Sequence, residues 1–191
     1  KRLLSLDLHR GARVAIVADT SPDFLRFFFA CQLAGFVPVP LPISIHLGGH
    51  DVYVKQLRRL LQTCGASAAM APEEIVPFLE EASTGLNLII QGGADVFASL
   101  PEVSYDLCPL GPSELAYIQF TSGSTRWPRG VEITQEAVLS NLSGIIQHGL
   151  QVQAGDRCVS WLPFYHDMGL VGFVLGPVAS QLSVDYVSTR D

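Results

Sequence analysis

The chain has 191 residues, of which 48% are hydrophobic and 16% are charged, and its formal net charge is −6 at pH 7. This composition is typical of a globular protein with a substantial core. Because basic residues are few and scattered, we expect no nucleic-acid partner. The uncharged run at residues 168–184 is interrupted by glycines and a proline, and it indicates a buried helix and strand in place of a transmembrane segment.

The chain begins with Lys1 and shows no apolar signal segment, which favours a piece of a longer, cytoplasmic protein. The four cysteines are Cys31, Cys64, Cys108 and Cys158. They lie in or beside apolar segments and lack CxxC or Cys/His ligand spacing. We therefore interpret them as reduced core cysteines.

Strand and helix patterns alternate along the chain. Ser21 and Pro22 predict the start of a helix that ends before Gly35, and Gly65 predicts the end of a second helix. The expected strands cover residues 14–17, 37–41, 67–71, 88–90, 115–120 and 157–162, and the expected helices cover residues 22–34, 52–63, 73–82 and 135–148. This order predicts an α/β fold with a mostly parallel sheet and helices on both faces.

Residues 46–51 contain His46, His50 and Asp51 in a glycine-containing loop. Two histidines and one acid do not complete a coordination shell, so we interpret this segment as a solvated loop and not as a metal site.

Residues 121–130 form a hydroxyl-rich loop, Thr-Ser-Gly-Ser-Thr-Arg-Trp-Pro-Arg-Gly, between two extended segments. Glycine lets the backbone approach a ligand, and four hydroxyls and a guanidinium can donate to one oxyanion. The alternative is an exposed Ser/Gly turn, but the segment is longer than a hairpin needs. A Walker P-loop is excluded because Gly123 and Gly130 are too far apart and no Lys-Ser or Lys-Thr follows. The pattern favours a different polyphosphate-binding loop.

A second candidate site is the turn Tyr165-His166-Asp167, which follows the expected strand at residues 157–162. A lone histidine is usually structural, but a histidine directly after a strand and beside an acid favours a role in a site. Ligands of parallel sheets bind beyond the carboxyl ends of the strands. We therefore expect this turn and the loop at residues 121–130 to open onto the same edge.

With these two motifs the chain resembles the adenylate-forming enzymes, which include acyl-CoA synthetases, fatty acyl-AMP ligases, luciferases and peptide-synthetase adenylation domains. The phosphate loop of that family reads approximately Thr-Ser-Gly-Ser-Thr-Gly-x-Pro-Lys-Gly-Val. Residues 121–131 match it except that Arg126 replaces a glycine and Arg129 replaces the lysine. Arg126, together with Asp167 after His166, is similar to the fatty acyl-AMP ligase branch. The resemblance covers nearly the whole chain, more loosely before residue 110.

The resemblance implies a parent enzyme that condenses a fatty acid with ATP to form acyl-adenylate and pyrophosphate. It implies that His166 is catalytic and that Tyr165 and Asp167 border the substrate pocket. The residues it assigns to the β- and γ-phosphates are Thr121, Ser122, Gly123, Ser124, Thr125 and Arg129. Mg²⁺ would share the phosphate charge, with Thr121 as its protein contact.

The resemblance also implies an acceptor, namely an acyl carrier protein or the carrier domain of a polyketide or peptide synthase. Two alternatives stay open: a fatty acyl-CoA synthetase, and a non-catalytic nucleotide-binding module. Residues 1–191 would be the first α/β part of the N-terminal AMP-binding domain. The C-terminal domain of the family, with its adenylation lysine, would then be absent, and we expect the piece to be inactive alone.

Overall fold

The computed structural model describes residues 1–43, 49–104, 106–121 and 128–188. Its strands are β1 (Arg13–Val17), β2 (Val37–Leu41), β3 (Ala68–Met70), β4 (Ile90–Gly92), β5 (Leu115–Thr121), β6 (Arg129–Thr134), β7 (Arg157–Ser160) and β8 (Ser183–Tyr186). Its α-helices are α1 (Pro22–Leu33), α2 (His50–Cys64), α3 (Val76–Ser83), α4 (Ala94–Ala98), α5 (Gln135–Ser143) and α6 (Gly176–Ser180). Short 3-10 helices η1 (Arg2–Leu6) and η3 (Glu73–Ile75) and π-helices η4 (Gly144–Gly149) and η5 (Met168–Leu175) complete the described elements.

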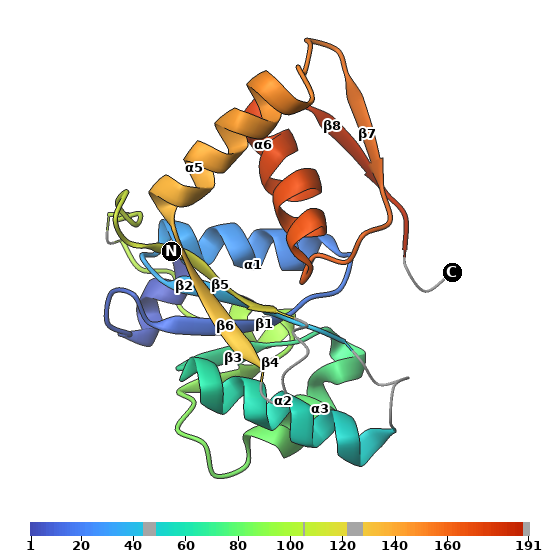
Figure 1. Cartoon of the computed structure of the whole chain (residues 1–191). Coiled ribbons are helices and arrows are strands. Elements are labelled where there is room, and N and C mark those ends of the chain that lie inside the picture. The colour runs from blue at the N-terminus through green and yellow to red at the C-terminus, as the bar shows by residue number, and fades with distance from the viewer. Residues whose placement is uncertain (44–48, 105, 122–127, 189–191) are drawn as a thin grey trace.

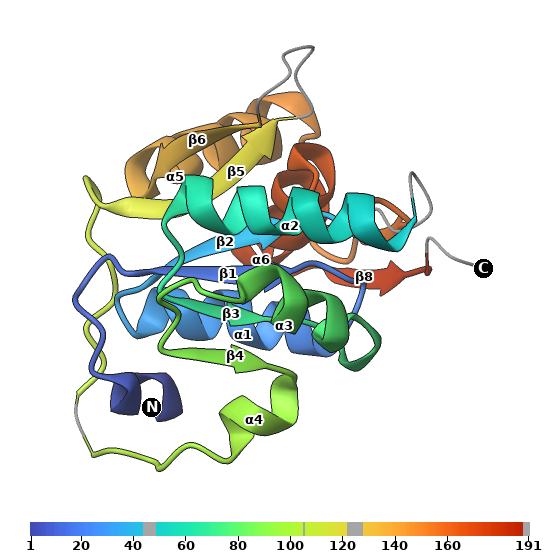
Figure 2. The same ribbon diagram turned by 90° about the horizontal axis from the view of Figure 1, so that it is seen from below.

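Four strands form a parallel sheet in the order β2-β1-β3-β4. Helix α1 covers one face of this sheet, and α2 and α3 cover the other (Figures 1 and 2). The predicted α/β class, with a parallel sheet and helices on both faces, is therefore confirmed.

The core lies on both faces of the sheet because side chains alternate along β1. Val14 and Ile16 pack in the cluster that contains Phe24 and Phe28 of α1. Ala15 and Val17 point the other way, into the cluster formed with α2 and α3. The central strand is thus buried on both faces, as parallel strands usually are.

The helix boundaries follow from local signals. The Ser21 hydroxyl accepts a hydrogen bond from the Phe24 amide (3.3 Å), and Pro22 occupies the first position of α1. Helix α2 ends at Gly65, whose φ of 61° is the left-handed conformation that glycine adopts at helix ends. Both predicted boundaries are confirmed.

The remaining strands lie outside the four-stranded sheet. Strands β5 and β6 form an antiparallel hairpin, and β7 pairs in parallel with β8. The hairpin lies along β2 without pairing to it (Figure 2). We expected the loop at residues 121–130 and the turn at residues 165–167 to open onto the same edge of one parallel sheet, and the strands that precede them instead belong to two separate sheets.

Prolines in β2 explain why the sheet stops there. The Val37 amide donates to the Ala12 carbonyl (2.9 Å), so the odd-numbered residues of β2 pair with β1. Alternation turns the nitrogens of Pro38 and Pro40 to the opposite edge, where β5 lies. A proline nitrogen cannot donate, and prolines are therefore confined to edge strands. Strand β2 is an edge strand by composition.

The cysteine interpretation was correct for Cys31 and Cys64, which are buried, and wrong for Cys108 and Cys158. Cys108 is exposed because it belongs to an irregular segment that precedes β5 and runs over the surface. Cys158 is half-buried on the two-stranded sheet. All four thiols are free.

Two further expectations concern metal sites and membrane spans. His46 lies outside the described residues, and His50 and Asp51 begin α2. Within the described ranges, no group of three or more His, Cys, Asp or Glu side chains could hold a metal ion. In the same part of the chain, no helix has the length and apolar character needed to cross a membrane.

Candidate functional site

The strands of the hairpin bracket the predicted phosphate loop. Thr121 is the last residue of β5 and pairs with Arg129, the first residue of β6, and both are exposed. The backbone positions that carry the Thr121 hydroxyl and the Arg129 guanidinium are therefore neighbours at the tip of the hairpin. The other predicted phosphate ligands, Ser122, Gly123, Ser124 and Thr125, lie outside the described residues, as does Arg126.

The two faces of β5 have different neighbours. Ile118 and Phe120 pack in the cluster that contains α2. Tyr117 points to the opposite side, where its ring lies 6.0 Å from that of Phe28 in α1. Because side chains alternate along a strand, Gln119 and Thr121 share the side of Tyr117.

The turn that carries His166 is held by its own backbone and by an aromatic anchor. The His166 amide donates to the Pro163 carbonyl (3.1 Å), and the Leu170 amide donates to the His166 carbonyl (2.8 Å). Phe164 is buried between Phe24 and Tyr186, with ring centroids 5.2 and 5.0 Å away. The turn is thus attached to the core through Phe164.

Gly169 closes the turn at a position that accepts no side chain. A Cβ there would overlap the carbonyl oxygen of Pro163. The close approach of the two backbones, and not an unusual φ, makes glycine necessary here.

A side-chain hydrogen bond joins the turn to the hairpin. The Gln119 amide nitrogen donates to the Tyr165 carbonyl across 3.1 Å, and Gln119 is only 6% exposed. The two segments predicted from sequence are therefore in contact, although their strands belong to different sheets. The sequence analysis missed Gln119. The available signal was a single amide within the otherwise apolar strand pattern of residues 115–120.

Asp167 orients the imidazole of His166. Its carboxylate Oδ1 lies 2.6 Å from Nδ1 of His166. Nδ1 cannot both donate to Asp167 and accept from the Met168 amide, which lies 3.3 Å away. The contact between Nδ1 and the charged Asp167 oxygen is the shorter of the two, so we assign the hydrogen bond of Nδ1 to Asp167. The Met168 amide donates to the Asp167 carboxylate instead, across 2.7 Å. Nδ1 therefore carries a proton, and Nε2 remains for a ligand.

The carboxylate of Asp167 also acts on β5. Burial raises the pKa of the Tyr117 hydroxyl to about 12, and the negative charge of Asp167 adds to this rise. The side chains of His166 and Asp167 are 53% and 73% exposed, so a ligand can reach both.

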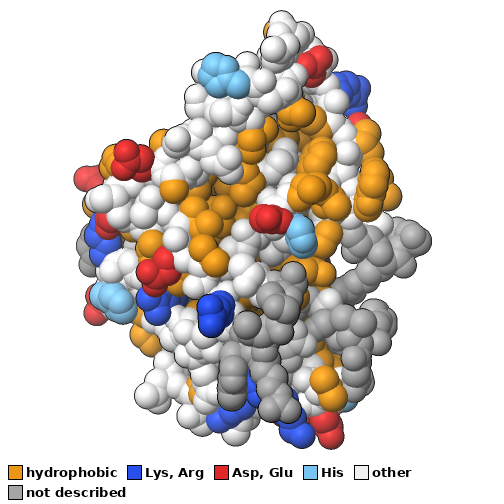
Figure 3. Space-filling view, in the orientation of Figure 1, with side chains coloured by type: hydrophobic (Ala, Val, Ile, Leu, Met, Phe, Trp, Pro, Cys, Tyr) orange, Lys and Arg blue, Asp and Glu red, His pale blue; other side chains and the backbone are white. Residues whose placement is uncertain are grey.

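Apolar surface lies next to this turn. Met168 and Trp161 are 60% and 63% exposed. Figure 3 shows apolar side chains gathered over the upper half of the face, around α5 and α6, with a histidine and an acidic side chain at their lower margin. Exposed apolar surface of this kind is typical of a place where a ligand or more protein binds.

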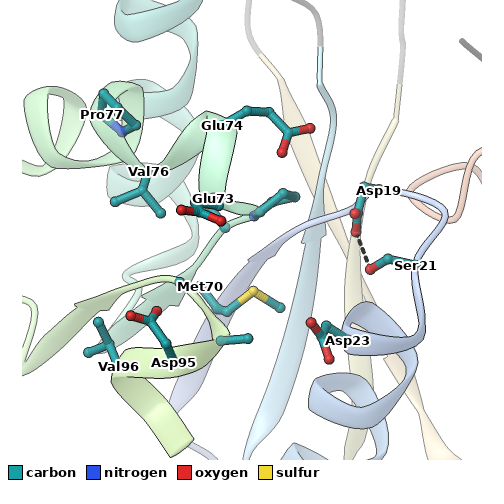
Figure 4. Close-up of a pocket in the computed structure, with 14 residues that line it drawn as sticks. Asp19, Ser21, Asp23, Met70, Glu73, Glu74, Val76, Pro77, Asp95 and Val96 are labelled. Atoms are coloured by element: carbon teal, nitrogen blue, oxygen red, sulfur yellow. Dashed lines mark hydrogen bonds between the residues drawn. The ribbon is translucent and has the colours of Figure 1, made fainter.

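A cavity of about 670 Å³ lies elsewhere, at the carboxyl ends of β1, β3 and β4 (Figure 4). Five carboxylates line it: Asp19, Asp23, Glu73, Glu74 and Asp95. None of the predicted site residues lines it, and its negative field disfavours a polyphosphate. The location fits the general rule for ligands of parallel sheets, but the charge does not fit ATP.

Fold and site together define an α/β protein with a hydroxyl-rich loop at a hairpin tip and a His-Asp turn packed against the same hairpin. The chain belongs to the AMP-binding enzyme family, whose model matches residues 1–190.

Known proteins resemble nearly the full length of this chain. A protein of Caulobacter vibrioides, whose name assigns it provisionally to the acyl-CoA synthetases, is 40% identical over 99% of the chain. A long-chain-fatty-acid–AMP ligase, FadD32 of Mycolicibacterium smegmatis, is 34% identical over 88% of the chain. A structure from work on fatty acyl-adenylate ligases of E. coli and L. pneumophila is 49% identical over the whole chain, with a TM-score of 0.93. The chain spans 33%, 26% and 34% of these proteins, respectively.

Proposed function

We propose that the protein containing this chain activates a fatty acid with ATP, forming an acyl-adenylate and releasing pyrophosphate. The observation that carries the proposal is the hydrogen bond from Gln119 to the Tyr165 carbonyl, because it joins the strand before the phosphate loop to the turn of His166. The similarity to a fatty-acid–AMP ligase and to fatty acyl-adenylate ligase structures supports the substrate class.

The loop residues hold the leaving group in this proposal. The fatty acid carboxylate attacks the α-phosphorus, and the bond to the pyrophosphate oxygen breaks. The residues that hold the β- and γ-phosphates are Thr121, Ser122, Gly123, Ser124, Thr125 and Arg129. Because charge accumulates on the departing pyrophosphate, donors fixed around it lower the barrier.

His166 aligns the reacting groups. With Nδ1 bonded to Asp167, its Nε2 edge faces the carboxylate and the α-phosphate. When Nε2 also carries a proton, it can donate to an oxygen of either group and reduce the repulsion between the two anions. Tyr165 and Asp167 border the pocket, and the neighbouring apolar surface receives the acyl chain.

Mg²⁺ is the proposed metal cofactor, and it supplies positive charge to the phosphate oxygens when bound. The described residues hold no cluster of three metal ligands, so the fit is to a cation carried mainly by phosphate oxygens and water. The exposed Thr121 hydroxyl is the protein oxygen that we assign to it.

The proposed acceptor of the acyl group is an acyl carrier protein or a carrier domain. Arg126 and Asp167 favour this assignment through their likeness to the fatty acyl-AMP ligase branch. The second candidate is a fatty acyl-CoA synthetase, which is favoured by the Caulobacter vibrioides relative at 40% identity.

The test gives the full-length protein a fatty acid, ATP and Mg²⁺, and then offers CoA and a holo acyl carrier protein in parallel. We expect acyl-AMP to accumulate and to be discharged by the carrier. Efficient formation of acyl-CoA would select the synthetase. Absence of pyrophosphate release with every fatty acid tried would reject the proposed chemistry.

A further inference from the structure

Gln119 is a buried amide in a strand whose neighbours are mostly apolar. Its relative exposure is 6%, and residues 116–118 are buried with it. Within the described residues, few buried side chains are polar: Ser83, Gln119 and Ser160. A buried amide is costly unless it is hydrogen-bonded, so the 3.1 Å bond to the Tyr165 carbonyl is part of what makes this side chain tolerable.

The bond crosses between two parts of the fold that share no sheet. Gln119 and Tyr165 are 46 residues apart in sequence. The backbone bonds of His166 and Leu170 stay within the turn and η5, and β5 pairs with β6. The Gln119 side chain therefore supplies a polar link from the hairpin to the turn.

Packing and the bonds within the turn fix its shape, but they orient the turn relative to the hairpin less strictly than a hydrogen bond between the two does. Phe164 is fixed between two rings, but apolar contacts do not prescribe one direction. A hydrogen bond does, because it weakens steeply when its angle departs from linearity. The carbonyl that Gln119 holds belongs to the peptide group between Tyr165 and His166. Its orientation sets the position of the imidazole.

We propose that Gln119 is a positioning residue that fixes His166 and Asp167 relative to Thr121. Gln119 and Thr121 lie on the same side of β5, two residues apart. The strand β5 therefore positions both the turn that Gln119 holds and the start of the phosphate loop. The roles of Thr121 and His166 rest on the proposed function, whereas the positioning is a property of the chain itself.

The chain offers a matched control. Gln32 of α1 donates from its amide nitrogen to the carbonyl of Ala116, also on β5, across 3.0 Å. Gln32→Met removes an amide-to-carbonyl bond on the same strand without touching the turn. Gln119→Met removes the bond to Tyr165 at nearly constant volume. Gln119→Glu keeps the shape and polarity but presents an oxygen to the carbonyl.

The first experiment is nuclear magnetic resonance, with selective isotope labelling, on the full-length protein that contains this chain. In both Gln119 variants we expect the Tyr165 carbonyl carbon and the His166 imidazole to change chemical shift. We also expect the His166 and Leu170 amides to exchange at least about fivefold faster. Gln32→Met should leave these signals unchanged. Signals that match the wild type in folded Gln119 variants would overturn the proposal.

A measurement without a variant covers the case in which a substitution prevents folding. In the wild-type protein, the side-chain amide protons of Gln119 should exchange slowly and show a scalar coupling to the Tyr165 carbonyl. Rapid exchange of these protons without the coupling would also overturn the proposal.

The second experiment separates this inference from the proposed function. Inorganic pyrophosphate added to the wild-type protein should shift both the Thr121 amide and the His166 imidazole. In Gln119→Met the Thr121 response should remain and the His166 response should fall at least about twofold. An equal His166 response in both proteins would overturn the coupling. Pyrophosphate that moves neither signal in the wild type would reject the phosphate role of the loop, and the first experiment would still decide the positioning.

Discussion

At the scale of single residues, the hairpin tip and the turn of His166 carry the proposed chemistry. Arg129 offers a fixed positive charge directly opposite Thr121. His166 offers Nε2, because its other ring nitrogen, Nδ1, is bonded to Asp167. Both side chains are exposed, so substitutions there should change function more than stability.

Arg129→Ala in the full-length protein should weaken the use of ATP more than the use of the fatty acid. A charge-assisted contact to phosphate contributes roughly 1.5–3 kcal/mol, so kcat/KM for ATP should fall at least about tenfold. Arg129→Lys should be milder because a point charge replaces part of the guanidinium. Arg26→Ala, which changes an exposed arginine on α1, is the control. Unchanged ATP kinetics in folded Arg129→Ala would refute the assignment.

Gly169→Ala should destabilise the chain by about 1–3 kcal/mol, because the new Cβ would overlap the Pro163 carbonyl and force the turn apart. The control is Gly172→Ala in the same helix, where a Cβ meets no heavy atom within 4 Å. That variant should be as stable as the wild type or up to about 1 kcal/mol more stable. Urea unfolding measures both, and equal stabilities of the two variants would contradict the close approach.

At the scale of elements, an ion pair ties the segment before β5 to the start of the chain. Arg10 donates to both carboxylate oxygens of Glu114, at 2.7 and 2.6 Å, and also to the carbonyls of Cys108 and Pro109. Glu114 accepts from the Gly111 amide as well. The hydrogen bonds from Arg10, and then that from Gly111, hold the pKa of Glu114 below its ordinary value.

This depressed pKa gives a pH-dependent contribution to stability. A carboxyl with a lowered folded pKa stabilises the fold above its unfolded pKa, about 4.3, and loses that contribution as the pH falls through the folded pKa. The difference in unfolding free energy between wild type and Glu114→Gln should therefore be full at pH 7 and shrink below about pH 4.3. Chemical denaturation across pH measures it, with Glu102→Gln as control. A difference that grows on acidification would contradict the ion pair.

The elements that the sequence predicted well are those set by neighbouring residues. Ser21, Pro22 and Gly65 act within one turn of helix, so the limits of α1 and α2 could be predicted. The packing of the β5–β6 hairpin along β2 joins segments that are far apart in sequence. The bond from Gln119 to Tyr165 is equally non-local, and no pattern of period 2 or 3.6 encodes it. The phosphate loop stays a prediction, and the sequence could suggest it because the pattern that defines it is contiguous.

The described chain consists of a four-stranded sheet with its helices and two smaller units packed against it, the β5–β6 hairpin and the β7–β8 sheet. The four-stranded sheet holds α1, α2 and α3, while the hairpin and the two-stranded sheet β7–β8 lie on the side of β2 and α1 (Figures 1 and 2). The candidate site falls where these units meet and not in the acidic cavity at the edge of the main sheet. The carboxylates that line that cavity disfavour an anion such as ATP, the proposed substrate.

Residues 1–191 alone should make no acyl-adenylate. The family resemblance assigns the adenylation lysine to a later domain, and the lysines of this chain are Lys1 and Lys55. The measurement is pyrophosphate release with ATP, Mg²⁺ and a fatty acid, compared with a boiled sample. Release above that control would show that the chemistry needs no further domain. Binding of pyrophosphate, tested separately, is compatible with either outcome.

The prolines of β2 have a mechanical consequence. Since Pro38 and Pro40 turn their nitrogens toward β5, the hairpin rests on the sheet through side chains, and no backbone ladder joins β2 to β5 in the described residues. Moving the hairpin along β2 would break no backbone hydrogen bond between these two strands in the described residues, but the side-chain bonds from Gln32 to Ala116 and from Gln119 to Tyr165 hold β5 in place. The register of β5 along β2 is therefore set by side chains and not by a backbone ladder, and the ladders of the four-stranded sheet do not depend on it.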